Sequence, residues 1–269
     1  MKKLIVLFFV IITVIIISCT NDNDEFSDDT TIEINFRHTW GNDEVTNEDF
    51  NDLKFRNENG EMLSIERLRY LISDIYLENE SGTVTDLTDF VLVNLGEEKN
   101  LTFTTENLLV NGTYNLFFRF GLSNEDNFIE EGYPELNSEN FNVPSTLGGG
   151  YHYMQFDGKY IDSLNVETGF NYHAIRATNV TTIENEEDLL EADTSFEVDL
   201  GEVEIINNTV TINVQMDIAE WFANPNTWDL NEFDQMLMPN YEAQIMMNEN
   251  GASVFSLIEE EITEEEAEE

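Results

Sequence analysis

Cysteine occurs once in this chain of 269 residues, at Cys19. A disulfide framework, a thiolate metal site and thiol catalysis are therefore excluded from the body of the protein. Basic residues are also scarce, with 11 Lys and Arg against 56 Asp and Glu, which gives a net charge of −45. Such a surface repels nucleic acid and anionic lipid head groups and attracts cations.

The N-terminus lacks an apolar run long enough to span a membrane, which takes about 20 residues. Lys2 and Lys3 precede a short apolar segment that ends in Ser18 and Cys19, which is typical of a secretory signal peptide. We predict that residues 1–18 are removed and that Cys19 becomes lipidated, as at a bacterial lipobox. The expected location is the outer membrane, facing the cell surface or the periplasm.

Composition and turn signals divide the rest of the chain. Residues 19–31 are polar and acidic and form a tether, residues 32–258 form one domain, and residues 259–269 form an acidic tail predicted to be disordered. With 41% hydrophobic and 12% aromatic residues, the domain is too apolar to be disordered as a whole.

Within the domain, about ten short stretches alternate between apolar and polar residues or are rich in β-branched and aromatic residues. The pattern predicts an all-β fold, an antiparallel β-sandwich with long loops and one or two short helices near the C-terminus. Residues 217–222 read as one of those helices, whereas Tyr241 to Met247 read as a strand and Asp157-Gly158 as a turn.

Histidine is present only as His38, His152 and His173. All three lie among apolar residues on predicted strands. His152 and Met154 are two residues apart, so they are expected to project from one face of a strand. His173 lies on the following strand and could approach them. Imidazole is the commonest ligand of zinc and copper, and a methionine thioether favours Cu(I). The alternative is that each histidine is a half-buried side chain hydrogen-bonded to backbone.

Four segments of the chain form a recognisable series: residues 36–38 (FRH), 68–75 (LRYLISDI), 150–158 (GYHYMQFDG) and 172–175 (YHAI). Together they resemble the MbnP-like family of extracytoplasmic copper-binding β-proteins. The resemblance covers roughly residues 32–257 and implies a β-sandwich and a mononuclear histidine site for copper, with zinc as the second choice. His173 matches a family histidine, although Ile175 stands where the family has glycine.

On these grounds we expect a metal site of His38, His152, His173 and Met154, in a protein that acquires or handles copper without catalysis. A di-haem peroxidase-like protein and an outer-membrane transporter are the partners considered. Methanotroph members of the family carry tryptophans just before the 150–158 segment, where this chain has Thr146 to Gly150, so a tryptophan-derived ligand is not expected there.

A rival hypothesis is a surface adhesion or glycan-binding module. Tyr151, Tyr153, Tyr172 and Trp40 would then form an exposed aromatic platform, and the histidines would lie far apart. An enzyme would instead need an open metal position beside a general base such as Asp157.

Overall fold

The computed structural model describes residues 30–258, apart from 182–183 and 207. The predicted signal peptide, most of the tether including Cys19, and the acidic tail therefore lie outside the described residues. The domain begins slightly earlier than expected, because Thr30 already belongs to the first strand. No helix in the described part of the chain is long and apolar enough to cross a membrane.

One sheet has the strand order β15-β14-β1-β2, and β7 also pairs with β1. Its strands are β1 (Thr30–Trp40), β2 (Asp43–Glu44), β7 (Thr102–Asn107), β14 (Thr209–Asp217) and β15 (Phe255–Leu257). The alternation of β1 has the expected effect, since Ile32, Ile34, Phe36 and His38 are all buried. The β1–β14 pair is parallel, which corrects the expectation of a wholly antiparallel fold. Alternation reports which face is buried but not the direction of the neighbouring strand.

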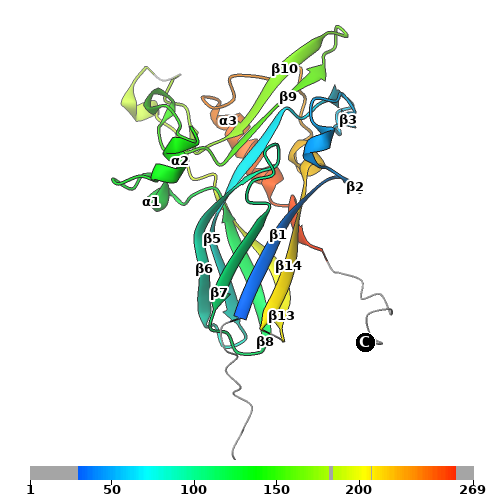
Figure 1. The fold of residues 1–269 in the computed structure, drawn as a ribbon. Coiled ribbons are helices and arrows are strands. Elements are labelled where there is room, and N and C mark those ends of the chain that lie inside the picture. Colours follow the sequence, from blue (N-terminus) through cyan, green and yellow to red (C-terminus); the bar gives the residue numbers. More distant parts are fainter. Residues whose placement is uncertain (1–29, 182–183, 207, 259–269) are drawn as a thin grey trace, which may run out of the picture.

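The larger sheet has the order β13-β8-β5-β9-β4-β3, with β6 on β5 and β10 on β9. Its strands are β3 (Phe55–Arg56), β4 (Met62–Leu63), β5 (Arg67–Asn79), β6 (Val84–Asn94), β8 (Gly112–Phe120), β9 (Met154–Ile161), β10 (Glu167–Ala174) and β13 (Phe196–Ile205). The long strands curl into a half-barrel, and β9 and β10 continue beyond it (Figure 1). The predicted β-rich class with a few short helices is thus confirmed.

The remaining elements are short. They are the two-stranded sheet of β11 (Ala177–Thr178) and β12 (Glu191–Ala192), the α-helices α1 (Asn124–Asn127), α2 (Pro134–Ser138) and α3 (Tyr241–Gly251), and the 3₁₀ helices η1 (Asn47–Asp49), η2 (Ser145–Leu147), η3 (Glu186–Asp188) and η4 (Ile218–Phe222). In Figure 1 helix α3 lies beside β9 and β10, whereas α1 and α2 lie to the left, near the upper end of the half-barrel.

The strand predicted at Tyr241 to Met247 is wrong, because these residues form helix α3. The Asn240 side chain caps the helix by accepting a hydrogen bond from the Ala243 backbone N–H (3.1 Å). Gln244 is fully buried and bonds the backbone of β10 from this helix. The apolar residues of the segment are compatible with either a helix or a strand, so the hydrogen bonds made by Asn240 and Gln244 decide the conformation.

The turn predicted at Asp157-Gly158 is also wrong, because β9 runs straight through both residues. Glycine is required at position 158 for packing: a Cβ there would lie 2.0 Å from the Ser64 carbonyl oxygen. The chain turns four residues later, where the Asp162 side chain accepts hydrogen bonds from the backbone N–H groups of Leu164 and Val166. As a result, Asp157 stands in the middle of a strand pair and faces β10.

Candidate metal centre

The three glycines before His152 fold the chain tightly into β9. Gly148, Gly149 and Gly150 all have positive φ, at +103°, +73° and +77°. At Gly150 a Cβ would lie 2.7 Å from the Asn127 Oδ1 atom, and this same oxygen accepts a hydrogen bond from the Tyr151 backbone N–H (2.8 Å). The glycines therefore allow a left-handed turn pressed against Asn127, and they fix where the next residues begin.

His152 lies just before β9 and is 5% exposed. Its backbone N–H and its Nδ1 atom both contact the Phe141 carbonyl oxygen, at 2.8 and 2.9 Å. A carbonyl oxygen only accepts, so Nδ1 carries the proton. Burial lowers the pKa of His152 to about 4, and the hydrogen bond to Phe141 offsets this only in part. The ring is therefore neutral at neutral pH, and Nε2 has a free lone pair.

His173 lies on β10 and is held by Asp157 on β9. Its Nε2 atom lies 2.8 Å from Asp157 Oδ1. Burial alone would raise the pKa of Asp157, but hydrogen bonds from His173 and Asn171 and the charge of Arg67 outweigh it and lower that pKa to about 2. The carboxylate is thus ionised and accepts the Nε2 proton. The other ring nitrogen, Nδ1, is buried and has no hydrogen-bond partner in the described part of the chain.

The two imidazoles lie against each other. Their ring centroids are 5.3 Å apart and their planes cross at 83°. A metal bonded to one nitrogen of each ring at about 2.0–2.1 Å allows ring centres at most roughly 6.4 Å apart, so the spacing fits one shared metal. Each ring also has one nitrogen held by an acceptor while the other is left without a partner. Metal-bound histidines have this arrangement, with the anchored N–H setting the tautomer and orientation.

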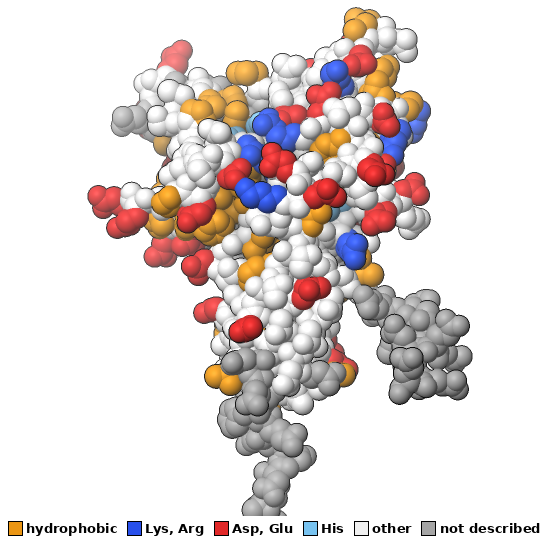
Figure 2. All heavy atoms as spheres, viewed as in Figure 1, with side chains coloured by type: hydrophobic (Ala, Val, Ile, Leu, Met, Phe, Trp, Pro, Cys, Tyr) orange, Lys and Arg blue, Asp and Glu red, His pale blue; other side chains and the backbone are white. Residues whose placement is uncertain are grey.

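Charged residues surround the pair. Arg67 forms an ion pair with Asp157, and Arg69 donates from Nε to the Gln155 side-chain oxygen (2.7 Å). The Arg69 guanidinium also lies over the Phe141 ring, 5.3 Å from its centroid. In Figure 2 most of the visible Lys and Arg side chains gather on the upper part of the molecule, whereas acidic side chains are spread widely. Two of the few cations of this acidic chain, Arg67 and Arg69, thus bond the side chains of Asp157 and Gln155, which flank His173.

The structure does not bring Met154 to this pair. His173 is paired in register with Gln155, and Met154 is paired with Ala174 and Tyr70. Because neighbouring strand residues face opposite ways, Met154 points to the side of the sheet away from His173. The expected shared face of His152 and Met154 is therefore wrong. The chain is irregular before Met154, so the alternation within β9 does not extend back to His152.

His38 lies on β1, in the other sheet, and is 2% exposed. Its Nε2 atom lies 3.0 Å from the Tyr70 hydroxyl oxygen, and Tyr70 is on the same face as Met154. Burial lowers the pKa of His38 to about 4. The three histidines are thus divided into an adjacent pair and a separate buried residue. No cluster of three or more His, Cys, Asp or Glu side chains in the described residues is arranged to hold a metal.

The aromatic platform of the rival hypothesis is not formed. Tyr151, Tyr153 and Tyr172 are 6%, 0% and 0% exposed. The Trp40 indole N–H donates to the Arg56 carbonyl oxygen (3.0 Å), and its ring packs on Phe55. The three tyrosines are therefore part of the interior, and Trp40 packs against its neighbours.

Sequence reasoning missed the groups that hold the two rings. The Phe141 carbonyl carries no sequence signal, because every residue has one. The contact of Asp157 with His173 could have been predicted by aligning the two residues across a hairpin. The turn assigned at Asp157-Gly158 prevented this, because it placed Asp157 outside the strand pair.

A β-rich fold with a half-barrel and a histidine pair on an adjoining two-stranded extension describes the class of protein. A family model matches residues 29–247 with the description MbnP, and the chain belongs to the MbnP family. The resemblance seen in the sequence is thereby confirmed. The solved structure of MbnP from Methylosinus trichosporium is similar, with a TM-score of 0.53 and 13% identity, covering 86% of this chain and 98% of that one. At this identity the likeness shows the shared fold. No curated protein matches the chain.

Proposed function

We propose that this protein binds one copper ion through His152 and His173 and serves in copper acquisition or handling outside the cytoplasm. The observation that carries the proposal is the state of the two rings. Each has one nitrogen anchored by an acceptor, Phe141 O or Asp157 Oδ1, and the other nitrogen of His173, Nδ1, is buried with no hydrogen-bond partner among the described residues. Leaving the Nδ1 atom of His173 buried without a partner costs free energy, about 1–3 kcal/mol, and a bound metal would remove that cost.

The donor set supports copper, with zinc as the alternative. Neutral imidazole suits both metals, and membership of the MbnP family favours copper. In this proposal His152 and His173 bind the metal, while Asp157 and the Phe141 carbonyl orient them. Met154 is left out because it lies on the other face of the larger sheet, and His38 because it lies on β1 of the other sheet and contacts Tyr70 on that same face. Copper would supply redox or ligand-exchange chemistry when bound, but the role proposed is binding and not catalysis.

The test is metal binding by the mature protein and by three matched variants. Purified protein is titrated with Cu(II), and with Cu(I) under reducing conditions, against a chromophoric competitor. We expect one equivalent to bind to the wild type and tight binding to be lost in His152→Ala and in His173→Ala. His38→Ala is the control, because it removes the third histidine and should leave the stoichiometry at one. Equal copper binding by all four proteins would refute the assignment.

We also propose that Cys19 anchors the protein to the outer membrane. Support comes from the sequence alone: this cysteine follows a short apolar leader, and an acidic tether separates it from the domain. A copper-binding domain held there would be placed to pass metal to a membrane or periplasmic partner, such as an outer-membrane transporter or a di-haem peroxidase-like protein.

A further inference from the structure

A cavity lies apart from the histidine pair, between the edge strands of the two sheets. Strand β6 borders the larger sheet and β7 borders the smaller one, and helix α2 covers the space between them. The cavity holds about 390 Å³, which is within the range of small-molecule sites, about 300–1,000 Å³. No residue that lines it bonds His152 or His173 in the described structure.

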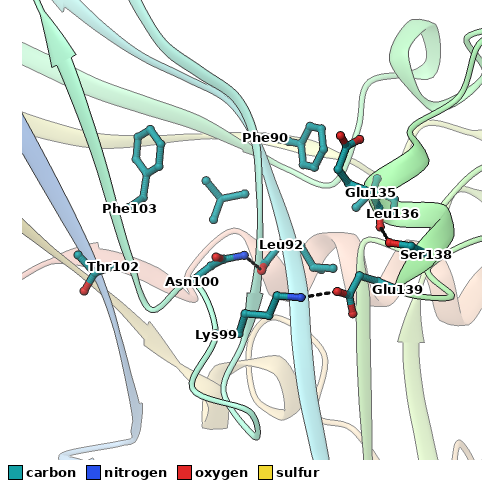
Figure 3. A pocket seen from close by; sticks show the side chains of 11 residues that line it. Phe90, Leu92, Lys99, Asn100, Thr102, Phe103, Glu135, Leu136, Ser138 and Glu139 are labelled. Carbon is teal, nitrogen blue, oxygen red and sulfur yellow. Dashed lines mark hydrogen bonds and ion pairs between the residues drawn. The ribbon is translucent and has the colours of Figure 1, made fainter.

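The two ends of the cavity differ in chemistry. Figure 3 shows the rings of Phe90 and Phe103 at one end, with the Glu135 carboxylate beside Phe90, and the Lys99 side chain at the other end. Val91, Leu92 and Leu136 complete the apolar lining, and all three are buried. Phe90 and Phe103 are only partly buried, and Phe90 also packs against Tyr133 in a T-shaped contact, with ring centroids 5.3 Å apart. The exposed parts of both rings can contact a ligand. An aromatic and apolar lining of this kind favours a ligand that contains a flat ring.

At the polar end, the ammonium group of Lys99 is the main hydrogen-bond donor available to a ligand. One N–H of the Asn100 side-chain amide donates to the Leu92 carbonyl oxygen, and the Ser138 hydroxyl donates to the Glu135 carbonyl oxygen, both at 2.8 Å. Lys99 is ion-paired with Glu139, but an ammonium group has three N–H donors, so it can donate again. A ligand here would therefore place an oxygen acceptor next to Lys99.

The charges around the cavity argue against an anionic ligand. Glu135 and Glu139 both line it, against the single cation Lys99, and the net charge of the whole chain is −45. An added carboxylate or sulfonate would therefore enter a negative field. We propose that the cavity between β6 and β7 binds an uncharged, ring-containing apolar molecule that presents one oxygen acceptor to Lys99.

The cavity also adjoins the support of the metal centre. Glu139, which pairs with Lys99, lies 4.0 Å from the Arg69 guanidinium. Two residues further along the chain, the Phe141 carbonyl holds His152. A ligand under α2 would thus contact the segment that positions one of the two imidazoles. The proposal does not depend on copper binding, because the cavity shares no ligating side chain with the pair.

The test uses two fluorescent naphthalene probes of opposite expectation. Prodan is uncharged and has one ketone oxygen, whereas 8-anilinonaphthalene-1-sulfonate shares the naphthalene but adds a phenyl ring and a negative charge. We expect prodan to bind the folded mature protein with a blue-shifted emission, and the sulfonate to bind at least about tenfold more weakly, because it carries a charge into an apolar and acidic site. Sulfonate binding as tight as that of prodan would overturn the proposed ligand class.

Two variants locate the probe. Phe103→Glu places a charge on the apolar wall, and Ser138→Trp fills the rim from an exposed position. Each should weaken prodan binding at least about tenfold. Leu164→Glu is the matched control: it makes the same kind of change at a residue 81% exposed, in the β9–β10 turn, and should alter binding less than about twofold.

Circular dichroism of each variant shows whether it is folded. Prodan affinity unchanged in folded Ser138→Trp, or reduced equally in Leu164→Glu, would refute the site even if the histidine pair binds copper. If the histidine variants lose copper binding but keep prodan binding, the cavity is a ligand site that is independent of the metal centre.

Discussion

Replacing Asp157 with asparagine isolates the contribution of the group that orients His173. The wild-type carboxylate lies 2.8 Å from His173 Nε2 and 2.6 Å from Asn171 Nδ2, and it pairs with Arg67. An asparagine keeps the size and one acceptor oxygen, so the ring has a partner but loses the charge behind it. Arg67 meanwhile loses its counter-charge and adds repulsion toward a metal cation.

Loss of such an outer-shell carboxylate costs about 10–100-fold in metal affinity, which is about 1.4–2.8 kcal/mol. We expect the copper dissociation constant of Asp157→Asn to rise within this range. Because part of the effect comes from unpaired Arg67, adding Arg67→Gln to Asp157→Asn should recover a fraction of the affinity. The assay is competitive titration with a chromophoric chelator at fixed pH and ionic strength.

Asp89→Asn is the matched control, since Asp89 is an exposed aspartate on β6. It makes the same change in net charge away from the pair and should leave the affinity within about twofold. An Asp157→Asn affinity within twofold of wild type would contradict the view that this carboxylate supports a ligand, and it would favour a purely structural role for the Asp157–His173 contact.

Three more results are expected. Burial lowers the pKa of His38 from 6.5 to about 4, so the unfolded chain binds the proton more readily, and the stability present above pH 6.5 falls as the pH drops toward 4. Denaturant titrations should therefore show that His38→Gln loses roughly 2 kcal/mol less than wild type between pH 7.5 and 5. Gly150→Ala should destabilise the fold by about 1–3 kcal/mol and weaken copper binding, because φ is +77° and Asn127 occupies the space of a Cβ. Cys19→Ser should release the protein from the membrane fraction of cells, and an unchanged distribution would exclude the anchor.

The β-rich fold class and the family could both be predicted from the sequence. Alternation in β1 correctly placed Ile32, Ile34, Phe36 and His38 on a buried face, because a two-residue period is a local property of a strand. Turn signals were less reliable: Asp157-Gly158 has turn composition, but its glycine serves the close approach of the Ser64 backbone.

By itself, then, the sequence determined a β-rich fold, the MbnP family and three candidate histidines. Only the tertiary structure decided which two of them meet. Strand pairing sets the register of His173 opposite Gln155, and an irregular entry through three glycines turns His152 to the same side. Both depend on contacts between residues far apart in the chain, such as Asn127 with Gly150 and Phe141 with His152. Long-range contacts of this kind leave no periodic trace in the sequence, and they alone separate the paired histidines from His38.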